Sequence, residues 1–179
     1  DYNQNFLKTD LDGNLYIAGS FKGTVDFGLA WGVSDNKTSV GDYNIYLTKI
    51  NSNGIYGWTK TITGVNYKGV KSIVVDKNKN VYITGEFRDT VNFGADWGSS
   101  DEKTSSGGSD AFLTKINSDG TYSWTKKIGG GDEDTSNSIT VDSNLNVYIT
   151  GNFKGVVNFS ADWSGTANIA SGGERDIFI

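Results

Sequence analysis

Three short segments rich in aspartate and asparagine carry side chains that could bind a hard cation. Each has the pattern Asp-x-[Asp/Asn]-x-Asn, which places oxygen atoms at alternate positions, as calcium sites do. The nine residues are Asp10, Asp12, Asn14, Asp76, Asn78, Asn80, Asp142, Asn144 and Asn146. The twelfth position of each segment, where an EF-hand needs glutamate, holds Phe21, Phe87 or Phe153. The segments therefore predict either weak calcium sites or hairpin turns whose aspartate accepts backbone N–H groups.

A second group of residues could bind sugars. Trp31, Trp97 and Trp163 recur in similar surroundings, and Asp96 and Asp162 directly precede the second and third of them. Aromatic faces stack on sugar C–H groups, and a neighbouring carboxylate accepts sugar hydroxyls. The group predicts a carbohydrate platform, or else packing of each tryptophan over a seam between repeated units.

An acidic run at residues 132–134 is the one candidate for acid/base chemistry, of the kind that two carboxylates perform in a glycosidase or lyase. The stretch one repeat earlier, residues 66–68, is not acidic, so a solvated loop is the alternative. The chain has no His and no Cys. That composition excludes serine and cysteine triads with a histidine base, zinc sites built from thiolate or imidazole, and histidine-bound haem.

The net charge and the hydropathy of the sequence argue against two further kinds of partner, nucleic acid and the interior of a membrane. The sequence has 16 Lys and Arg against 21 Asp and Glu, a net charge of −5, which argues against a nucleic-acid partner. It contains no apolar run long enough to form a transmembrane segment. Calcium is therefore the only cofactor that the sequence suggests.

The elements that must position these residues come from an internal repeat. Asn14–Gly19, Asn80–Gly85 and Asn146–Gly151 are nearly identical and lie 66 residues apart, as do the three tryptophans. Alternating β-branched and aromatic residues, separated by Asp-, Asn- and Gly-rich turns, predict four strands in each repeat. The expected strands span residues 5–9, 14–21, 44–50, 55–62, 70–75, 80–87, 110–116, 121–128, 137–141, 146–153 and 175–179.

Such sheets predict an all-β fold of β-propeller blades. A four-stranded antiparallel sheet that is apolar on both faces must be covered by copies of itself, and radial stacking of such sheets makes a propeller. The chain would hold about 2.7 blades: a first blade at 1–65, a second at 66–131 and a partial third at 132–179. The long connection between the second and third strands of a blade is expected to contain a short extra strand or plug at its Val-x-Phe segment.

The sequence resembles a known repeat family over essentially its whole length. The matching segments are Ser106–Gly120, Trp124, Ile128–Gly130, Ile139–Asp142 and Asn146–Gly151. They look like the bacterial SBBP-type β-propeller repeat and, more distantly, NHL repeats. The resemblance implies a secreted or surface-exposed propeller, and it supplies no catalytic residues that could be carried over to this chain.

These features predict a non-catalytic module, extracellular or on the cell surface, for protein interaction or structural assembly. A lectin-like propeller is the alternative, and a carboxylate-based glycosidase or lyase is the third. The expected partners are a protein, a polysaccharide, or further copies of the same repeat. Since two and a fraction blades cannot close a ring of about four to eight, we expect a segment of a longer chain or copies that complete a ring or fibre.

Overall fold

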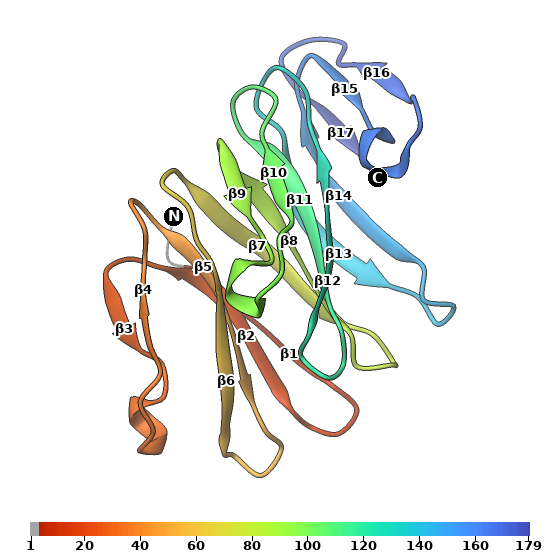
Figure 1. The fold of residues 1–179 in the computed structure, drawn as a ribbon. Coiled ribbons are helices and arrows are strands. Elements are labelled where there is room, and N and C mark those ends of the chain that lie inside the picture. The colour runs from red at the N-terminus through yellow and green to blue at the C-terminus, as the bar shows by residue number, and fades with distance from the viewer. Residues whose placement is uncertain (1–3) are drawn as a thin grey trace.

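The computed structural model describes residues 4–179, and its main feature is three stacked sheets (Figure 1). The first sheet has the order β1–β2–β5–β6, with β1 (Phe6–Thr9), β2 (Leu15–Phe21), β5 (Asn44–Ile50) and β6 (Tyr56–Ile62). The second has the order β7–β8–β11–β12, with β7 (Lys68–Val75), β8 (Val81–Phe87), β11 (Asp110–Ile116) and β12 (Tyr122–Ile128). The third has the order β13–β14–β17, with β13 (Thr135–Val141), β14 (Val147–Phe153) and β17 (Asp176–Phe178). We call the sheets, with their connections, units 1, 2 and 3.

The predicted fold class is confirmed. Every neighbouring pair of strands in the three sheets is antiparallel, and each four-stranded sheet runs in chain order as a propeller blade does. Each strand expected from the sequence is present, and its ends lie within two residues of the expected ones. Among residues 4–179 no helix is long and apolar enough to cross a membrane.

Each unit also carries a small hairpin. The paired strands are β3 (Thr24–Asp26) with β4 (Asn36–Thr38), β9 (Thr90–Asn92) with β10 (Glu102–Thr104), and β15 (Val156–Asn158) with β16 (Asn168–Ala170). A single turn of 3-10 helix joins each pair: η1 (Leu29–Trp31), η2 (Ala95–Trp97) and η3 (Ala161–Trp163). The Val-x-Phe segment is the expected extra strand. Its partner strand and the helical turn were not predicted, because three residues are too few to show a period.

One side chain closes each small hairpin. In unit 1 the Oδ1 atom of Asp26 accepts the N–H groups of Gly28 and Asp35, at 3.1 and 2.9 Å. Asn92 and Asn158 make the same pair of bonds in units 2 and 3. The Asp or Asn in the middle of each Val-x-Phe segment therefore accepts the hydrogen bonds that hold the loop of the small hairpin, which carries the tryptophan.

The core fills the seams between units. A large buried cluster joins units 1 and 2 and includes Tyr16, Ile73 and Ile83. A smaller one, built on Tyr82, Leu113 and Ile139, joins units 2 and 3. The units therefore stack face to face on their sheets, with the first strands β1, β7 and β13 adjacent (Figure 1).

Candidate functional site

The three aspartate-led segments form the turns between the first and second strands of each unit. In unit 2, Oδ1 of Asp76 accepts the N–H groups of Asn78 and Asn80 at 2.8 and 2.9 Å. Its Oδ2 accepts the side-chain amide of Asn80 at 2.8 Å and the hydroxyl of Tyr82 at 3.3 Å. The same four bonds form around Asp10 and around Asp142.

These bonds are those of a hairpin turn, the other role considered for the segments. Burial alone would raise the pKa of the Asp10 carboxyl, but the hydrogen bonds from Asn14 and Asp12 outweigh it and hold that pKa below its usual value. Within residues 4–179 no group of three acidic side chains gathers as a metal cluster. Calcium binding at these turns stays a prediction.

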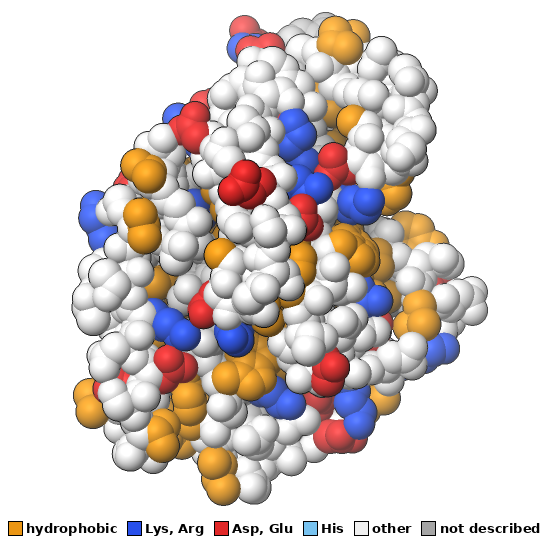
Figure 2. Space-filling model, viewed as in Figure 1, with side chains coloured by type: hydrophobic (Ala, Val, Ile, Leu, Met, Phe, Trp, Pro, Cys, Tyr) orange, Lys and Arg blue, Asp and Glu red, His pale blue; other side chains and the backbone are white. Residues whose placement is uncertain are grey.

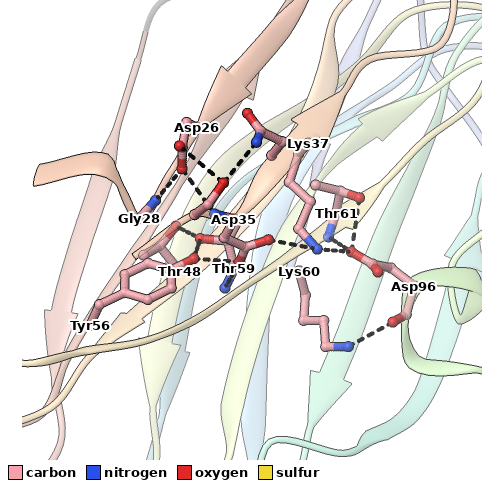
Figure 3. A network of polar contacts seen from close by, with 12 residues as sticks. Asp26, Gly28, Asp35, Lys37, Thr48, Tyr56, Thr59, Lys60, Thr61 and Asp96 are labelled. Atoms are coloured by element: carbon pink, nitrogen blue, oxygen red, sulfur yellow. Dashed lines mark hydrogen bonds and ion pairs between the residues drawn. The ribbon is translucent and has the colours of Figure 1, made fainter. Parts of the chain in front are cut away.

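Asp96 and Asp162, in the loops of the small hairpins, lie at the seams between units, where they form what we call clasps. Figure 3 shows the clasp of Asp96. Oδ2 of Asp96, in unit 2, accepts the backbone N–H and the hydroxyl of Thr61 on β6 of unit 1, at 2.8 and 3.0 Å. Its carbonyl oxygen accepts the ammonium of Lys60 at 2.7 Å. Lys37, on β4 of unit 1, lies 3.4 Å from the same Oδ2. One aspartate therefore ties together two strands of the preceding unit.

The next seam repeats this arrangement. Oδ2 of Asp162, in unit 3, accepts the N–H of Lys127 at 2.9 Å, and its carbonyl accepts the ammonium of Lys126 at 2.6 Å. Lys103, on β10 of unit 2, lies 3.1 Å from Oδ2 of Asp162 and 3.2 Å from Asp101. Burial alone would lower the pKa of Lys103, but the two carboxylates raise it above its usual value.

A tyrosine and a threonine support the acidic partner of each clasp lysine. In unit 1 the Asp35 carboxylate accepts the hydroxyl of Tyr56 at 2.6 Å and the N–H of Thr59 at 3.2 Å (Figure 3). Burial would raise the pKa of Asp35, yet Tyr56 and Lys37 hold it below its usual value. The clasp is therefore a charged network of partly buried groups.

The tryptophans occupy equivalent positions beside the clasps. The indole N–H of Trp97 donates to the carbonyl of Gly120 at 3.0 Å, and that of Trp31 donates to Gly54 at 2.8 Å. Lys60 of the preceding unit lies over the Trp97 ring, which is half-buried. Trp31 and Trp163 are 43% and 47% exposed. Lys126 of unit 2 lies over the Trp163 ring in the same way, so Trp97 and Trp163 both pack at seams, although Trp31 and Trp163 keep more exposed aromatic surface.

A depression with charges of both signs was not predicted from the sequence. It has a volume of about 450 Å³ and lies where the first and third strands of the units begin. We call it the polar rim, and its lining residues are Asp42, Tyr67, Lys71, Glu86, Arg88, Ser109 and Glu133.

Ion pairs connect the side chains of the polar rim. The ammonium of Lys71 lies 3.3 Å from Glu86, and Arg88 lies 2.7 Å from Glu133. Glu133 precedes β13 of unit 3, so its ion pair with Arg88 reaches across a seam, and it also pairs with Arg175 of its own unit at 2.8 Å. Figure 2 shows that acidic and basic side chains intermingle across the viewed face instead of forming a patch of one sign.

The sequence did contain a signal for the polar rim, because residues of unit 2 that line it differ from their equivalents in units 1 and 3. Glu86 stands where the other units have serine and asparagine, and Lys71 stands where both have asparagine. The acidic run contributes Glu133 alone to the rim. Asp134 is buried and accepts the N–H groups of Gly130 and Lys154, and burial raises its pKa.

Comparison with known proteins agrees with the architecture. Residues 123–152 match the family model SBBP, described as "Beta-propeller repeat". The chain is also similar to an uncharacterized WD repeat-containing protein, L264, of Acanthamoeba polyphaga mimivirus, with 26% identity over 173 residues. That alignment covers 83% of this chain but only 12% of the viral protein. Together with the three stacked sheets, the match shows that this chain carries an SBBP-type β-propeller repeat and is built of propeller blades.

Proposed function

We propose that the chain is a non-catalytic β-propeller module, extracellular or on the cell surface, that binds a protein through the polar rim. The rim is the observation that carries the proposal. Along the repeat, the clasp and turn aspartates of units 2 and 3 are held in bonds within the fold, whereas the rim is a concave surface at which the units differ. Its arginine and tyrosine are residue types enriched in protein interfaces.

The charges of the polar rim indicate the kind of partner. Arg88 and Glu133 are half exposed, so a partner with its own charged groups can exchange with this ion pair at little cost. Complementary charges would then orient the partner and speed its association. A protein surface with acidic and basic side chains close together fits such a site best.

The pairing of the rim carboxylates supports the non-catalytic character of the module, and a resemblance supports its location. The three carboxylates of the rim, those of Asp42, Glu86 and Glu133, are each paired with a cation, which is not the arrangement of a general acid that must carry a proton. The resemblance to SBBP-type proteins supports the proposed extracellular location, and fractionation of the natural protein tests it.

A matched pair of double variants tests binding at the rim. Arg88→Ala with Glu133→Ala removes a rim ion pair, and Lys154→Ala with Glu174→Ala removes an exposed ion pair of unit 3 whose lysine is the repeat equivalent of Arg88. The immobilised chains are exposed to proteins from the cells that produce it, and bound partners are crosslinked and identified. A partner retained by the unsubstituted chain and the control, but lost by the rim variant, supports the proposal. Equal capture by all three contradicts it.

Carbohydrate binding is the second candidate, because Trp31 and Trp163 present open aromatic surface. A glycan array with the unsubstituted chain and the Trp31→Ala variant tests it. Binding of a sugar that Trp31→Ala abolishes, together with no protein partner at the rim, would replace the first proposal by this one.

A further inference from the structure

The sequence contains only two arginines, and both contact one carboxylate. Arg88 and Arg175 are the arginines among its 16 basic residues, and all the others are lysines. Nη2 of Arg88 lies 2.7 Å from Oε1 of Glu133, and Nη2 of Arg175 lies 2.8 Å from Oε2 of the same side chain. The arginines belong to units 2 and 3, so the stacking of the units brings them together around this carboxylate.

Arg88 lacks the acidic partner that its equivalents have within their own units. In units 1 and 3 the position of Arg88 holds a lysine, which pairs with an acidic residue just before the third strand. The pairs are Lys22 with Asp42 and Lys154 with Glu174, at 3.0 and 3.1 Å. In unit 2 the acidic position holds Gly108. Glu133 of unit 3 takes the place of this missing acid.

Gly108 leaves the space that Glu133 occupies. A Cβ atom at Gly108 would lie 2.8 Å from Cγ of Glu133, closer than two carbon atoms approach without overlap. The N–H of Gly108 also donates to the carbonyl of Asp132 at 3.1 Å, which holds the segment of Glu133 against this loop. An aspartate or glutamate at this position, as in the other units, would push Glu133 away from Arg88. The glycine and the arginine thus make unit 2 a site for a carboxylate from outside the unit.

Two arginines around one carboxylate form a recognition site for that group. A guanidinium is planar and presents its N–H donors in a fixed arrangement that matches the two oxygens of a carboxylate, whereas an ammonium acts as a point charge. Asp42 and Glu86 line the same depression and add negative charge to its surroundings. They oppose the binding of phosphate, which carries more charge than a carboxylate near neutral pH. A singly charged carboxylate therefore fits the site best.

Glu133 can leave this site at little cost. The side chains of Arg88, Glu133 and Arg175 are 48%, 49% and 49% exposed. Ion pairs with this exposure contribute little net stability, because water solvates the separated charges well. An external carboxylate can therefore replace that of Glu133 on both guanidinium groups.

We propose that Arg88 and Arg175 bind a carboxylate of the protein partner, and that Glu133 occupies the same site while the partner is absent. This inference rests on the proposed function, since it names the group that the polar rim recognises. Only molecules in which Glu133 has moved away can bind the partner's carboxylate, so the apparent affinity is reduced in proportion to their fraction. Glu133 is thus a competitor within the chain that limits the affinity of the rim.

The two arginines provide a direct readout of the site. An isotope-labelled chain with two arginines gives one Nε–H resonance for each of them in a two-dimensional NMR spectrum. We titrate it with the blocked peptide Gly-Glu-Gly-Glu-Gly and expect both resonances to shift with a single Kd. Glu133→Gln removes the competitor and should lower this Kd at least about threefold. Arg88→Lys keeps the charge, restores the residue of the other units, and should raise the Kd at least about threefold.

Matched controls separate the site from general effects of charge. The peptide Gly-Gln-Gly-Gln-Gly has a similar shape without the charge and should shift neither resonance. Lys79→Ala removes a cation that pairs with Asp12 at the opposite end of β8, and it should leave the Kd within about twofold. Inorganic phosphate should bind less tightly than the glutamate peptide. Circular dichroism confirms that each variant is folded.

Any of the following results would overturn this inference: arginine resonances that do not respond to the glutamate peptide, an unchanged Kd in Glu133→Gln, an unchanged Kd in Arg88→Lys, or tighter binding of phosphate than of the peptide. The capture experiment with the double variants tests the proposed function separately. A partner captured through the rim, together with any of these results, would leave the proposed function standing and reject only the carboxylate site.

Discussion

Two equivalent positions in units 1 and 2 hold Asn44 and Asp110, whose side chains differ only in having an amide or a carboxylate. Asn44 is buried, and its amide donates to the carbonyls of Val40, Asp42 and Gly64, at 3.1, 3.2 and 3.2 Å. The equivalent residue in unit 2 is Asp110, which is also buried. A carboxylate cannot donate as the amide does, and Oδ1 of Asp110 has no hydrogen-bond partner within the described chain.

Replacing Asp110 by Asn should therefore stabilise the protein. Burial raises the pKa of Asp110 despite the nearby Lys127, so its charge is unfavourable in the folded state. We expect Asp110→Asn to raise the free energy of unfolding by about 1 kcal/mol at pH 7 in urea denaturation. The gain should shrink as the pH falls through the raised pKa, because the folded carboxyl is then protonated. Asn44→Asp is the matched control and should destabilise; loss of stability in Asp110→Asn would mean that the Lys127 ion pair outweighs burial.

Lys68 gives the chain a stability that rises with pH. Its side chain is buried, its ammonium donates to the carbonyls of Gly64 and Asn66, and burial lowers its pKa to about 8 despite the opposing effect of Asp42. Above pH 8 the folded chain has released this proton, while the unfolded chain, with a pKa near 10.5, still holds it. Stability should therefore rise by about 2 kcal/mol between pH 7 and 9.5.

The Lys68→Met variant tests this dependence. Urea denaturation at several pH values should show the rise in the unsubstituted chain and a nearly flat profile in the variant. The buried tyrosines Tyr16 and Tyr82 act in the opposite sense only above about pH 10, since their pKa values are raised to about 12. The same slope in both proteins would contradict the assignment.

At the scale of elements, the small hairpins of units 2 and 3 join these units to the preceding one. Asp96→Ala removes the acceptor for two hydrogen bonds from Thr61 and the partner of Lys37, and it should destabilise the chain by about 1 to 3 kcal/mol in urea denaturation. Asp96→Asn keeps an oxygen for Thr61 and should cost less, because the partly exposed ion pair contributes little. Glu102→Ala, on the exposed side of β10, is the control. Equal stability of Asp96→Ala and the control would show that the clasp does not hold the units together.

The turns between first and second strands are the other repeated element. Asp76→Ala leaves two backbone N–H groups without their side-chain acceptor and should lower the melting temperature, by an amount equivalent to about 1 to 2 kcal/mol. The same variant decides the calcium prediction. A calcium-dependent rise of the melting temperature that Asp76→Ala weakens would support it, and identical melting with calcium and with chelator would contradict it.

The sequence predicted these elements better than the contacts between them. The strand positions followed from the 66-residue repeat. The sequence also offered two definite roles for the Asp and Asn residues of the turns, which were calcium binding and closure of a hairpin turn. The clasp could not be predicted, since Asp96 and Thr61 lie in different units and their contact depends on how the sheets stack. The polar rim was missed for the same reason, since Arg88 of unit 2 and Glu133 of unit 3 meet only after the units are assembled.

At the scale of the whole molecule, the units differ in how well their neighbours cover them. In a repeat protein each unit is stabilised mainly by the units beside it. Unit 2 is covered on both faces, whereas unit 3 has one covered face and a sheet of three strands. Tyr82 is 4% exposed and its equivalent Tyr148 is 46% exposed, although the strands β8 and β14 have nearly the same sequence.

This near-identity allows a comparison of local stability within one chain. Val81–Phe87 and Val147–Phe153 differ at one residue, Glu86 against Asn152, so their intrinsic amide exchange rates are almost equal. We expect hydrogen exchange, followed by mass spectrometry in dilute solution, to be at least about tenfold faster in β14 than in β8, because local opening costs less where neighbours are missing. Repeating the measurement over a range of protein concentrations controls for association between copies. Equal protection of the two strands in dilute solution would show that unit 3 is stable without a neighbour on its open face.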